Sequence, residues 1–98
     1  MIKDLRNISE VIKNNSKVLR TNYKVSQLGV FGSVARGDYT QSSDVDMLVE
    51  FSKPVDLFEF VELRDFLSDM LNVRVDLVTK SALKPLIKEQ ILKDTIYV

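Results

Sequence analysis

The sequence predicts an α+β (α/β) fold, in which a small sheet is covered by helices. Three segments have strand character: the apolar run Gln27–Phe31, the alternating segment Asp44–Phe51 and the β-branched segment Val73–Thr79. The stretches around them space their apolar residues as amphipathic helices do. A chain of 98 residues is of the size of one domain, so we expect a single domain over residues 1–98.

The composition is that of an ordinary soluble protein, with 45% hydrophobic and 29% charged residues. Fourteen basic and fourteen acidic residues cancel, which disfavours binding to a long nucleic acid. No apolar run has the length of a signal peptide or a membrane span, so we expect a cytoplasmic protein without a membrane partner. Because cysteine and histidine are both absent, any chemistry must depend on carboxylates, hydroxyls and cations.

Two helices are expected before the first strand. The first covers about the first dozen residues, and a short second helix follows over Lys17–Tyr23, with Asn15 or Ser16 as its N-cap. Short polar side chains are favoured at that position because they can accept hydrogen bonds from free backbone N–H groups. The apolar positions of the first helix are Ile2, Leu5, Ile8 and Ile12.

Two more helices are expected in the second half of the chain. Asp56 and Glu59 have the spacing of a capping box and should open a helix that runs to about Leu71. Pro85 suits the first turn of a last helix down to about Asp94, preceded by Ser81 as a possible cap. The apolar stripe of this last helix consists of Leu86, Ile87, Ile91 and Leu92.

Asp44 and Asp46 are the first candidates for a chemical role. Residues two apart on a strand project from the same face, so the two carboxylates can converge on one cation. Magnesium prefers hard oxygen ligands and is usually held by one or two carboxylates together with substrate phosphates and water. Carboxylates held side by side also repel each other unless a cation or basic group is present. The pair therefore predicts a magnesium site.

Asp76 lies on a different predicted strand, with Val75 and Leu77 on the opposite face. If the two strands are neighbours, this third carboxylate joins the pair and completes a site for two metal ions. The sequence alone leaves that pairing open, and an isolated aspartate on an edge strand is more often simply exposed. With histidine absent, Asp76 is also the best available group to accept a proton from an attacking hydroxyl.

Gly32 and Ser33 follow a strand and precede a helical turn, where backbone N–H groups and a hydroxyl can approach a phosphate. This pattern is weak by itself, but an Asp-x-Asp ten residues later makes it far more specific. Arg36 could neutralise phosphate charge, or it could equally pair with a carboxylate such as Asp38 or Asp44.

The motif Gly32 to Gly37 (GSVARG), followed by Ser43 to Asp46 (SDVD), resembles the signature of the DNA polymerase beta-like nucleotidyltransferases. The short length and the segments Val75–Thr79 and Leu83–Val98 resemble the minimal nucleotidyltransferases (MNT) over almost the whole chain. These are antitoxins whose partner is a HEPN-domain ribonuclease toxin. The resemblance implies a small mixed sheet of three to four strands with helices packed on it.

The resemblance also implies an activity. Similar proteins transfer AMP from ATP to a tyrosine of the HEPN toxin and so silence its ribonuclease. Carried over to this chain, Gly32 and Ser33 bind the triphosphate, Asp44 and Asp46 hold Mg²⁺, and Asp76 completes the acidic triad of a site for two ions. We expect a hetero-oligomer with the toxin.

Two other functions stay open at this point. The chain could neutralise its partner simply by covering it, without catalysis. It could also transfer a nucleotide to a small molecule, as the aminoglycoside nucleotidyltransferases do, although those enzymes carry further domains for the acceptor and this chain has no length left for one.

Overall fold

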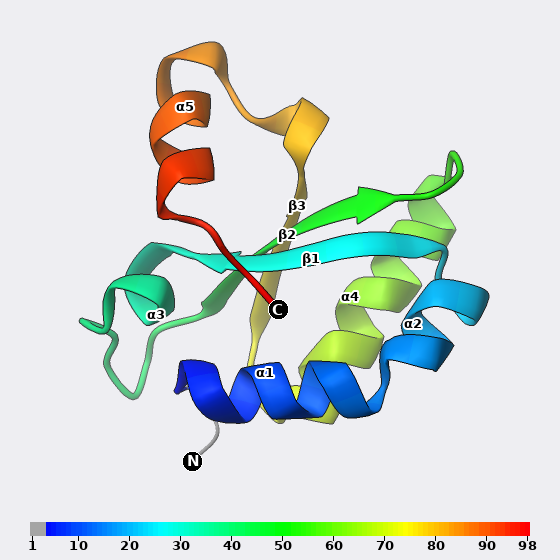
Figure 1. The fold of residues 1–98 in the computed structure, drawn as a ribbon, viewed down its shortest axis with the longest axis horizontal. Helices are drawn as coiled ribbons and strands as arrows, with labels where there is room; N and C mark the ends of the chain where they lie inside the picture. Colours follow the sequence, from blue (N-terminus) through cyan, green and yellow to red (C-terminus); the bar gives the residue numbers. More distant parts are fainter. Residues whose placement is uncertain (1–3) are drawn as a thin grey trace.

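The structure is a computed structural model that describes residues 4–98, and it consists of one four-stranded sheet with five helices (Figure 1). The strand order is β3-β2-β1-β4, with β2 parallel to β3 and β1 antiparallel to both of its neighbours. The predicted small mixed sheet is confirmed. The elements are α1 (Leu5–Asn14), α2 (Ser16–Asn22), β1 (Val25–Phe31), α3 (Gly32–Arg36), β2 (Val45–Phe51), α4 (Leu57–Leu71), β3 (Val75–Thr79), the 3₁₀ turn η1 (Lys80–Ala82), α5 (Pro85–Asp94) and β4 (Ile96–Tyr97).

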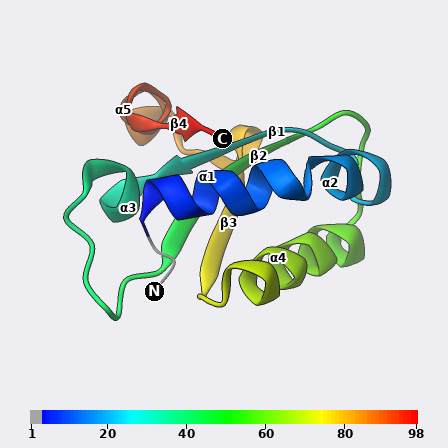
Figure 2. The same ribbon diagram turned by 60° about the horizontal axis from the view of Figure 1, so that its bottom comes forward.

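The helices divide between the two faces of the sheet. Figure 2 shows α1 and α4 on one face and α5 on the other. On β2, the side chains of Val45, Met47 and Val49 are buried against the helices of the first face. Because side chains alternate along a strand, Asp46 must point to the opposite face, on which α5 lies. The same alternation buries Val75 and Leu77 and leaves Asp76 exposed.

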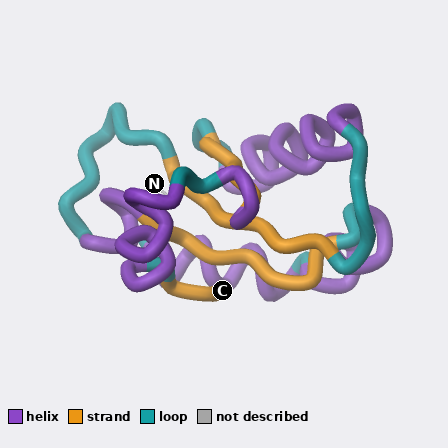
Figure 3. Tube along the Cα trace, turned by 90° about the horizontal axis from the view of Figure 1, so that it is seen from above, coloured by secondary structure: helices purple, strands orange, loops and turns teal. Residues whose placement is uncertain are grey.

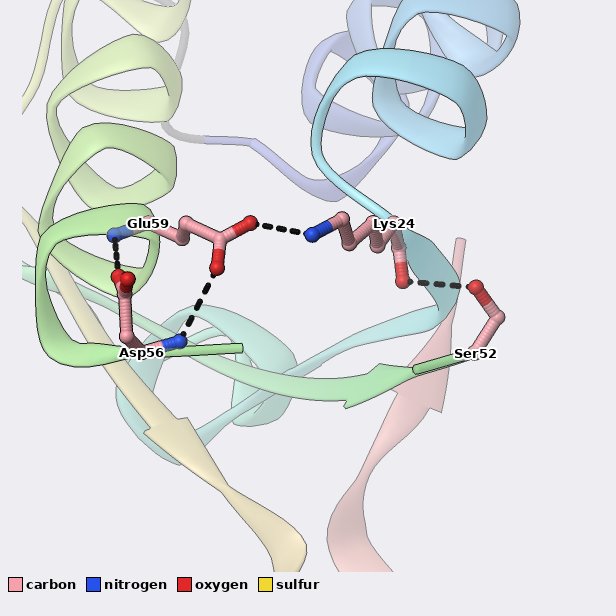
Figure 4. Close-up of polar contacts among 4 residues, drawn as sticks. All are labelled: Lys24, Ser52, Asp56 and Glu59. Atoms are coloured by element: carbon pink, nitrogen blue, oxygen red, sulfur yellow. Dashed lines mark hydrogen bonds and ion pairs between the residues drawn. The ribbon is translucent and has the colours of Figure 1, made fainter. Parts of the chain in front are cut away.

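The start of α4 is fixed by a small polar network (Figure 4). The Asp56 carboxylate accepts a hydrogen bond from the Glu59 N–H at 2.8 Å, and the Glu59 carboxylate accepts one from the Asp56 N–H at 3.2 Å, so the predicted capping box is confirmed. The other Glu59 oxygen lies 2.6 Å from Lys24 Nζ. The Lys24 carbonyl in turn accepts a hydrogen bond from Ser52 N–H at 2.8 Å. The network therefore ties α4 to the ends of β1 and β2.

Replacing Glu59 with glutamine should make the protein less stable at neutral pH, while the difference disappears in acid. The Lys24 ammonium and the Asp56 N–H lower the pKa of Glu59 below its usual value of 4.5. A carboxyl with a lowered pKa in the folded protein stabilises the fold above its unfolded pKa and loses that contribution as pH falls. Thermal melts of both proteins between about pH 3 and 7 test this. Melting curves that stay equally far apart at every pH would contradict it.

Three details of the structure differ from the expectations. Asn15 is the N-cap of α2, but its side chain makes no capping bond; its Nδ2 group donates a hydrogen bond to the Val11 carbonyl at 2.8 Å. Ser81 does not cap α5, since it lies in η1 and the N-cap is Lys84. The strand β4 was not predicted, because only two residues form it. The expected helical position of Ile2 lies outside the described residues.

The last helix was predicted correctly, but its apolar stripe is not a core face. None of the residues of α5 is buried, and Leu86 is 98% exposed while Ile87 is 49% exposed. Its main contacts are with α3 and β1. Among residues 4–98, no helix has the length and apolar character that a membrane crossing requires.

Candidate functional site

The register of the sheet aligns the candidate site residues in one row. Phe31, the last residue of β1, is paired with Asp46 on β2, and Asp46 is paired with Asp76 on β3. Gly32 follows Phe31 directly. Neighbouring strands lie about 4.8 Å apart, so the glycine and the two carboxylates occupy adjacent positions at one end of the sheet. The pairing of β2 with β3, which the sequence left open, is present.

Asp44 lies just before β2 and not within it, because the strand begins at Val45. It is still close enough for its charge to act on Asp46. Asp44 and Asp46 are partly buried and Asp76 is exposed. The structure therefore brings the three carboxylates into one acidic cluster, which we call the aspartate cluster: Asp44, Asp46 and Asp76.

Asp46 is the most perturbed member of this cluster. The pKa of its carboxyl is raised from 3.8 to about 6, mainly by burial and further by the charges of Asp76 and Asp44 and a hydrogen bond with Asp76. Only the Arg36 guanidinium opposes this shift. The rise shows that the negative charge at Asp46 is poorly compensated by the protein itself, which is the electrostatic situation that a bound cation relieves.

The donor set of the aspartate cluster fits magnesium. Carboxylate oxygens are the hard ligands that this ion prefers, and it normally keeps waters and substrate phosphates in the rest of its shell. Within residues 4–98, no group of three or more acidic side chains is placed so that it could hold a metal ion by itself. An open arrangement is what a site completed by a nucleotide needs, because positions must stay available for phosphate oxygens.

Gly32 adjoins the aspartate cluster so closely that no other residue fits. Its φ angle is +71°, in the left-handed region, and a Cβ atom at this position would overlap the Asp46 carboxylate. Both features require glycine. The missing side chain lets the Asp46 carboxylate lie directly against the backbone at the start of α3.

The rest of the motif forms α3 and its C-cap. The Ser33 carbonyl accepts hydrogen bonds from the N–H groups of Gly37 and Asp38, at 2.9 and 3.1 Å. Arg36 Nε lies 3.3 Å from an Asp38 carboxylate oxygen, which is one of the two carboxylate pairings that the sequence allowed. Both side chains are more than half exposed, so this ion pair contributes little to stability and Arg36 can leave it for a phosphate.

Sequence reasoning did not find the residues that hold the loop before Asp44. This loop, residues 37–44, runs from α3 back to β2 (Figure 3). Ser43 N–H donates to the Thr40 carbonyl at 3.1 Å, and Thr40 N–H donates to Ser43 Oγ at 2.9 Å. Tyr39 packs against the hydrophobic core. These hydrogen bonds fix the path of the chain just before Asp44. In the sequence, the Thr-x-x-Ser spacing is the signal for this turn.

Comparison with known proteins identifies the family of the chain. The chain matches the nucleotidyltransferase domain family over residues 12–98. It is 42% identical over 94 residues to the protein adenylyltransferase MntA of Thermococcus cleftensis, covering 96% of this chain and 95% of that protein.

Two solved structures have the same fold. A candidate minimal nucleotidyltransferase superposes with a TM-score of 0.74 at 34% identity, covering 91% of this chain and 93% of that one. A toxin–antitoxin complex with AMP-PNP contains a chain with a TM-score of 0.72 at 27% identity, and the match covers 93% of this chain and 71% of that one. With the family match over most of its length, the chain belongs to the nucleotidyltransferase domain family, within which it resembles the minimal nucleotidyltransferases.

Proposed function

We propose that the chain is a magnesium-dependent protein adenylyltransferase that acts as an antitoxin. It transfers AMP from ATP to a tyrosine of a HEPN ribonuclease toxin and thereby inactivates the toxin. The observation that carries this proposal is that Gly32, which follows the last residue of β1, lies beside Asp46 on β2, and that Asp46 is paired with Asp76 on β3. The adenylyltransferase relative and the toxin–antitoxin complex with an ATP analogue support the choice of ATP and of a protein acceptor.

Each residue of the candidate site would have its own role. Asp44 and Asp46 would hold the magnesium, with Asp76 as the third carboxylate. When bound, magnesium neutralises charge on the phosphate oxygens and on the departing pyrophosphate. The backbone N–H groups at Gly32 and Ser33 would bind the triphosphate, and Arg36 would pair with a phosphate oxygen. These groups hold the α-phosphate in place for attack.

In the reaction, the tyrosine oxygen forms a bond to the α-phosphorus. The bond from that phosphorus to the oxygen bridging to the β-phosphate breaks, and pyrophosphate leaves with the electron pair. The phenolic proton passes to Asp76, whose side chain is exposed and therefore accessible to an acceptor protein.

The direct test incubates this chain with a purified HEPN ribonuclease toxin, ATP and magnesium. The mass of the toxin should increase by AMP units with the natural protein and stay unchanged with the double variant Asp44→Asn, Asp46→Asn. A matched control is Asp65→Asn with Asp69→Asn, which removes two exposed carboxylates from α4 and should leave the modification intact.

The same samples separate catalysis from simple covering of the toxin. If modification inactivates the toxin, its ribonuclease activity falls only when ATP is present and stays low after the antitoxin is removed. A toxin that gains AMP with the double variant, or that is silenced equally well without ATP, would rule out this proposal.

A further inference from the structure

A cavity of about 530 Å³ lies between α3 and α5, next to the candidate site. Figure 1 shows α5 beside α3, at the end of β1. We call this space the α3–α5 cavity. Phe31, Gly32 and Arg36 line one part of it, and α5 lines the other through Leu86, Ile87, Gln90, Ile91 and Asp94. Its volume is within the range of about 300–1,000 Å³ that small-ligand pockets span.

The position of the cavity suits the nucleoside of a bound nucleotide. It shares Gly32 and Arg36 with the triphosphate site proposed above, and none of the three aspartates lines it. The strand order places Asp76, on β3, on the opposite side of Asp46 from α5, which contacts β1. An acceptor hydroxyl that gives its proton to Asp76 therefore approaches from the β3 side. The nucleoside is bonded to the same α-phosphate that the acceptor attacks, so it must lie on another side of that phosphate. The side toward α5 is available for it.

The walls of the cavity suit the faces of a base. Leu86 is 98% exposed and Ile87 is 49% exposed, so the described chain leaves this apolar surface uncovered. Phe31 provides an aromatic side chain in the other part of the lining. A planar base held between aliphatic and aromatic side chains buries apolar surface on both of its faces.

Two polar side chains of α5 line the same cavity. Gln90 Nε2 donates a hydrogen bond to Asp94 Oδ2 at 3.0 Å. With one carboxylate oxygen engaged, the other is left as an acceptor that cannot donate. It can accept a hydrogen bond from an amino group such as that of adenine.

We propose that the α3–α5 cavity receives the nucleoside of ATP and that Asp94 accepts a hydrogen bond from the amino group of adenine. This inference rests on the proposed function, because it extends the same nucleotide site. It makes Asp94 a specificity-determining residue and not a catalytic one, since it lies away from the transferred phosphate.

The test measures binding by calorimetry on the full chain with magnesium, using ATP and inosine triphosphate (ITP). ITP carries a carbonyl oxygen where ATP carries the amino group. The natural protein should bind ATP more tightly by roughly tenfold or more, the effect of one hydrogen bond to a charged group. Asp94→Asn should bring the ratio of the two affinities close to one, because an amide can also donate to the carbonyl of ITP.

Two further variants control this result. Glu89→Gln removes a neighbouring exposed charge of α5 outside the cavity and should leave the preference for ATP unchanged. Leu86→Ser cannot disturb the core, because Leu86 is almost fully exposed, and it should weaken ATP and ITP equally. If Leu86→Ser instead weakens only the binding of the acceptor protein, α5 is a docking surface and the inference is wrong.

The outcomes distinguish this inference from the proposed function. If Asp94→Asn keeps the full preference of the natural protein for ATP, the nucleoside site is overturned, while modification of the toxin by the natural protein still supports the proposed function. If the natural protein prefers ATP through Asp94 but modifies no toxin, the nucleoside site is retained and only the protein acceptor is overturned.

Discussion

Replacing Asp46 with asparagine should lower the rate of nucleotidyl transfer by roughly a thousandfold, because metal stabilisation of the transition state contributes several kcal/mol. The amide has the size of the carboxylate but carries no charge, so a loss of this size reports on the cation and not on packing. Rates of toxin modification at saturating ATP and magnesium give the comparison. The control is Asp69→Asn on the exposed side of α4, and retention of more than about a tenth of the activity in Asp46→Asn would contradict the assignment.

The same variant should be more stable than the natural protein when magnesium is removed. Burial and the neighbouring carboxylates raise the pKa of Asp46 to about 6, so its ionised form is disfavoured in the folded state. Below the unfolded pKa of 3.8, this carboxyl is protonated in both the folded and the unfolded state and does not change the stability of the fold. As pH rises from 3.8 to about 6, the unfolded state ionises more readily than the folded state, so the fold loses stability. Melting curves in a chelator should therefore separate across this range, with Asp46→Asn higher at neutral pH.

Added magnesium should reverse that order. The ion binds the folded natural protein and raises its melting temperature by mass action, whereas the asparagine variant lacks one ligand and should respond less. A natural protein whose melting temperature does not change with magnesium, in the presence of a nucleotide, would argue against the aspartate cluster as a metal site.

Replacing Gly32 with alanine should have the second large effect, and Gly37 provides its matched control. Both glycines have positive φ angles, of +71° and +83°. Alanine at either position should cost about 1–2 kcal/mol for the left-handed backbone. At Gly37 nothing lies near the added methyl group, so the variant should be less stable but active.

At Gly32 the added methyl group would overlap the Asp46 carboxylate, so the aspartate or the start of α3 must move. A shift of about 1 Å in a reacting group can cost roughly a hundredfold in rate. We therefore expect Gly32→Ala to lose activity beyond its loss of stability, measured as transfer rates at a temperature where both variants are fully folded. Equal activity in the two variants would show that Gly32 serves only the backbone turn.

Local sequence signals predicted most of the elements because each depends on neighbouring residues. The capping box of Asp56 and Glu59 needs only two side chains three residues apart, and it opened α4 where expected. The alternation around Asp46 and Asp76 likewise follows from strand geometry alone, so their faces could be predicted before the fold was known. The family resemblance added the expected function, through the motif from Gly32 to Asp46.

Other features could not be predicted locally. Ser81 has the chemistry of a cap, but the path of the chain through η1 placed the N-cap of α5 three residues beyond it. The apolar spacing of Leu86 and Ile87 predicted a helix correctly. The spacing alone could not predict whether another part of the chain covers these side chains, and both are exposed. In this protein the described chain leaves them uncovered beside the candidate site.

The sequence by itself thus determined most of the elements, the donor types and the proximity of Asp44 to Asp46, because these follow from local spacing. Only the tertiary structure decided that β2 lies parallel to β3, which aligns Asp46 with Asp76. It also decided that Gly32 meets Asp46 and that α5 borders the same site. These contacts join residues far apart in the chain, and their formation depends on the packing of the whole sheet.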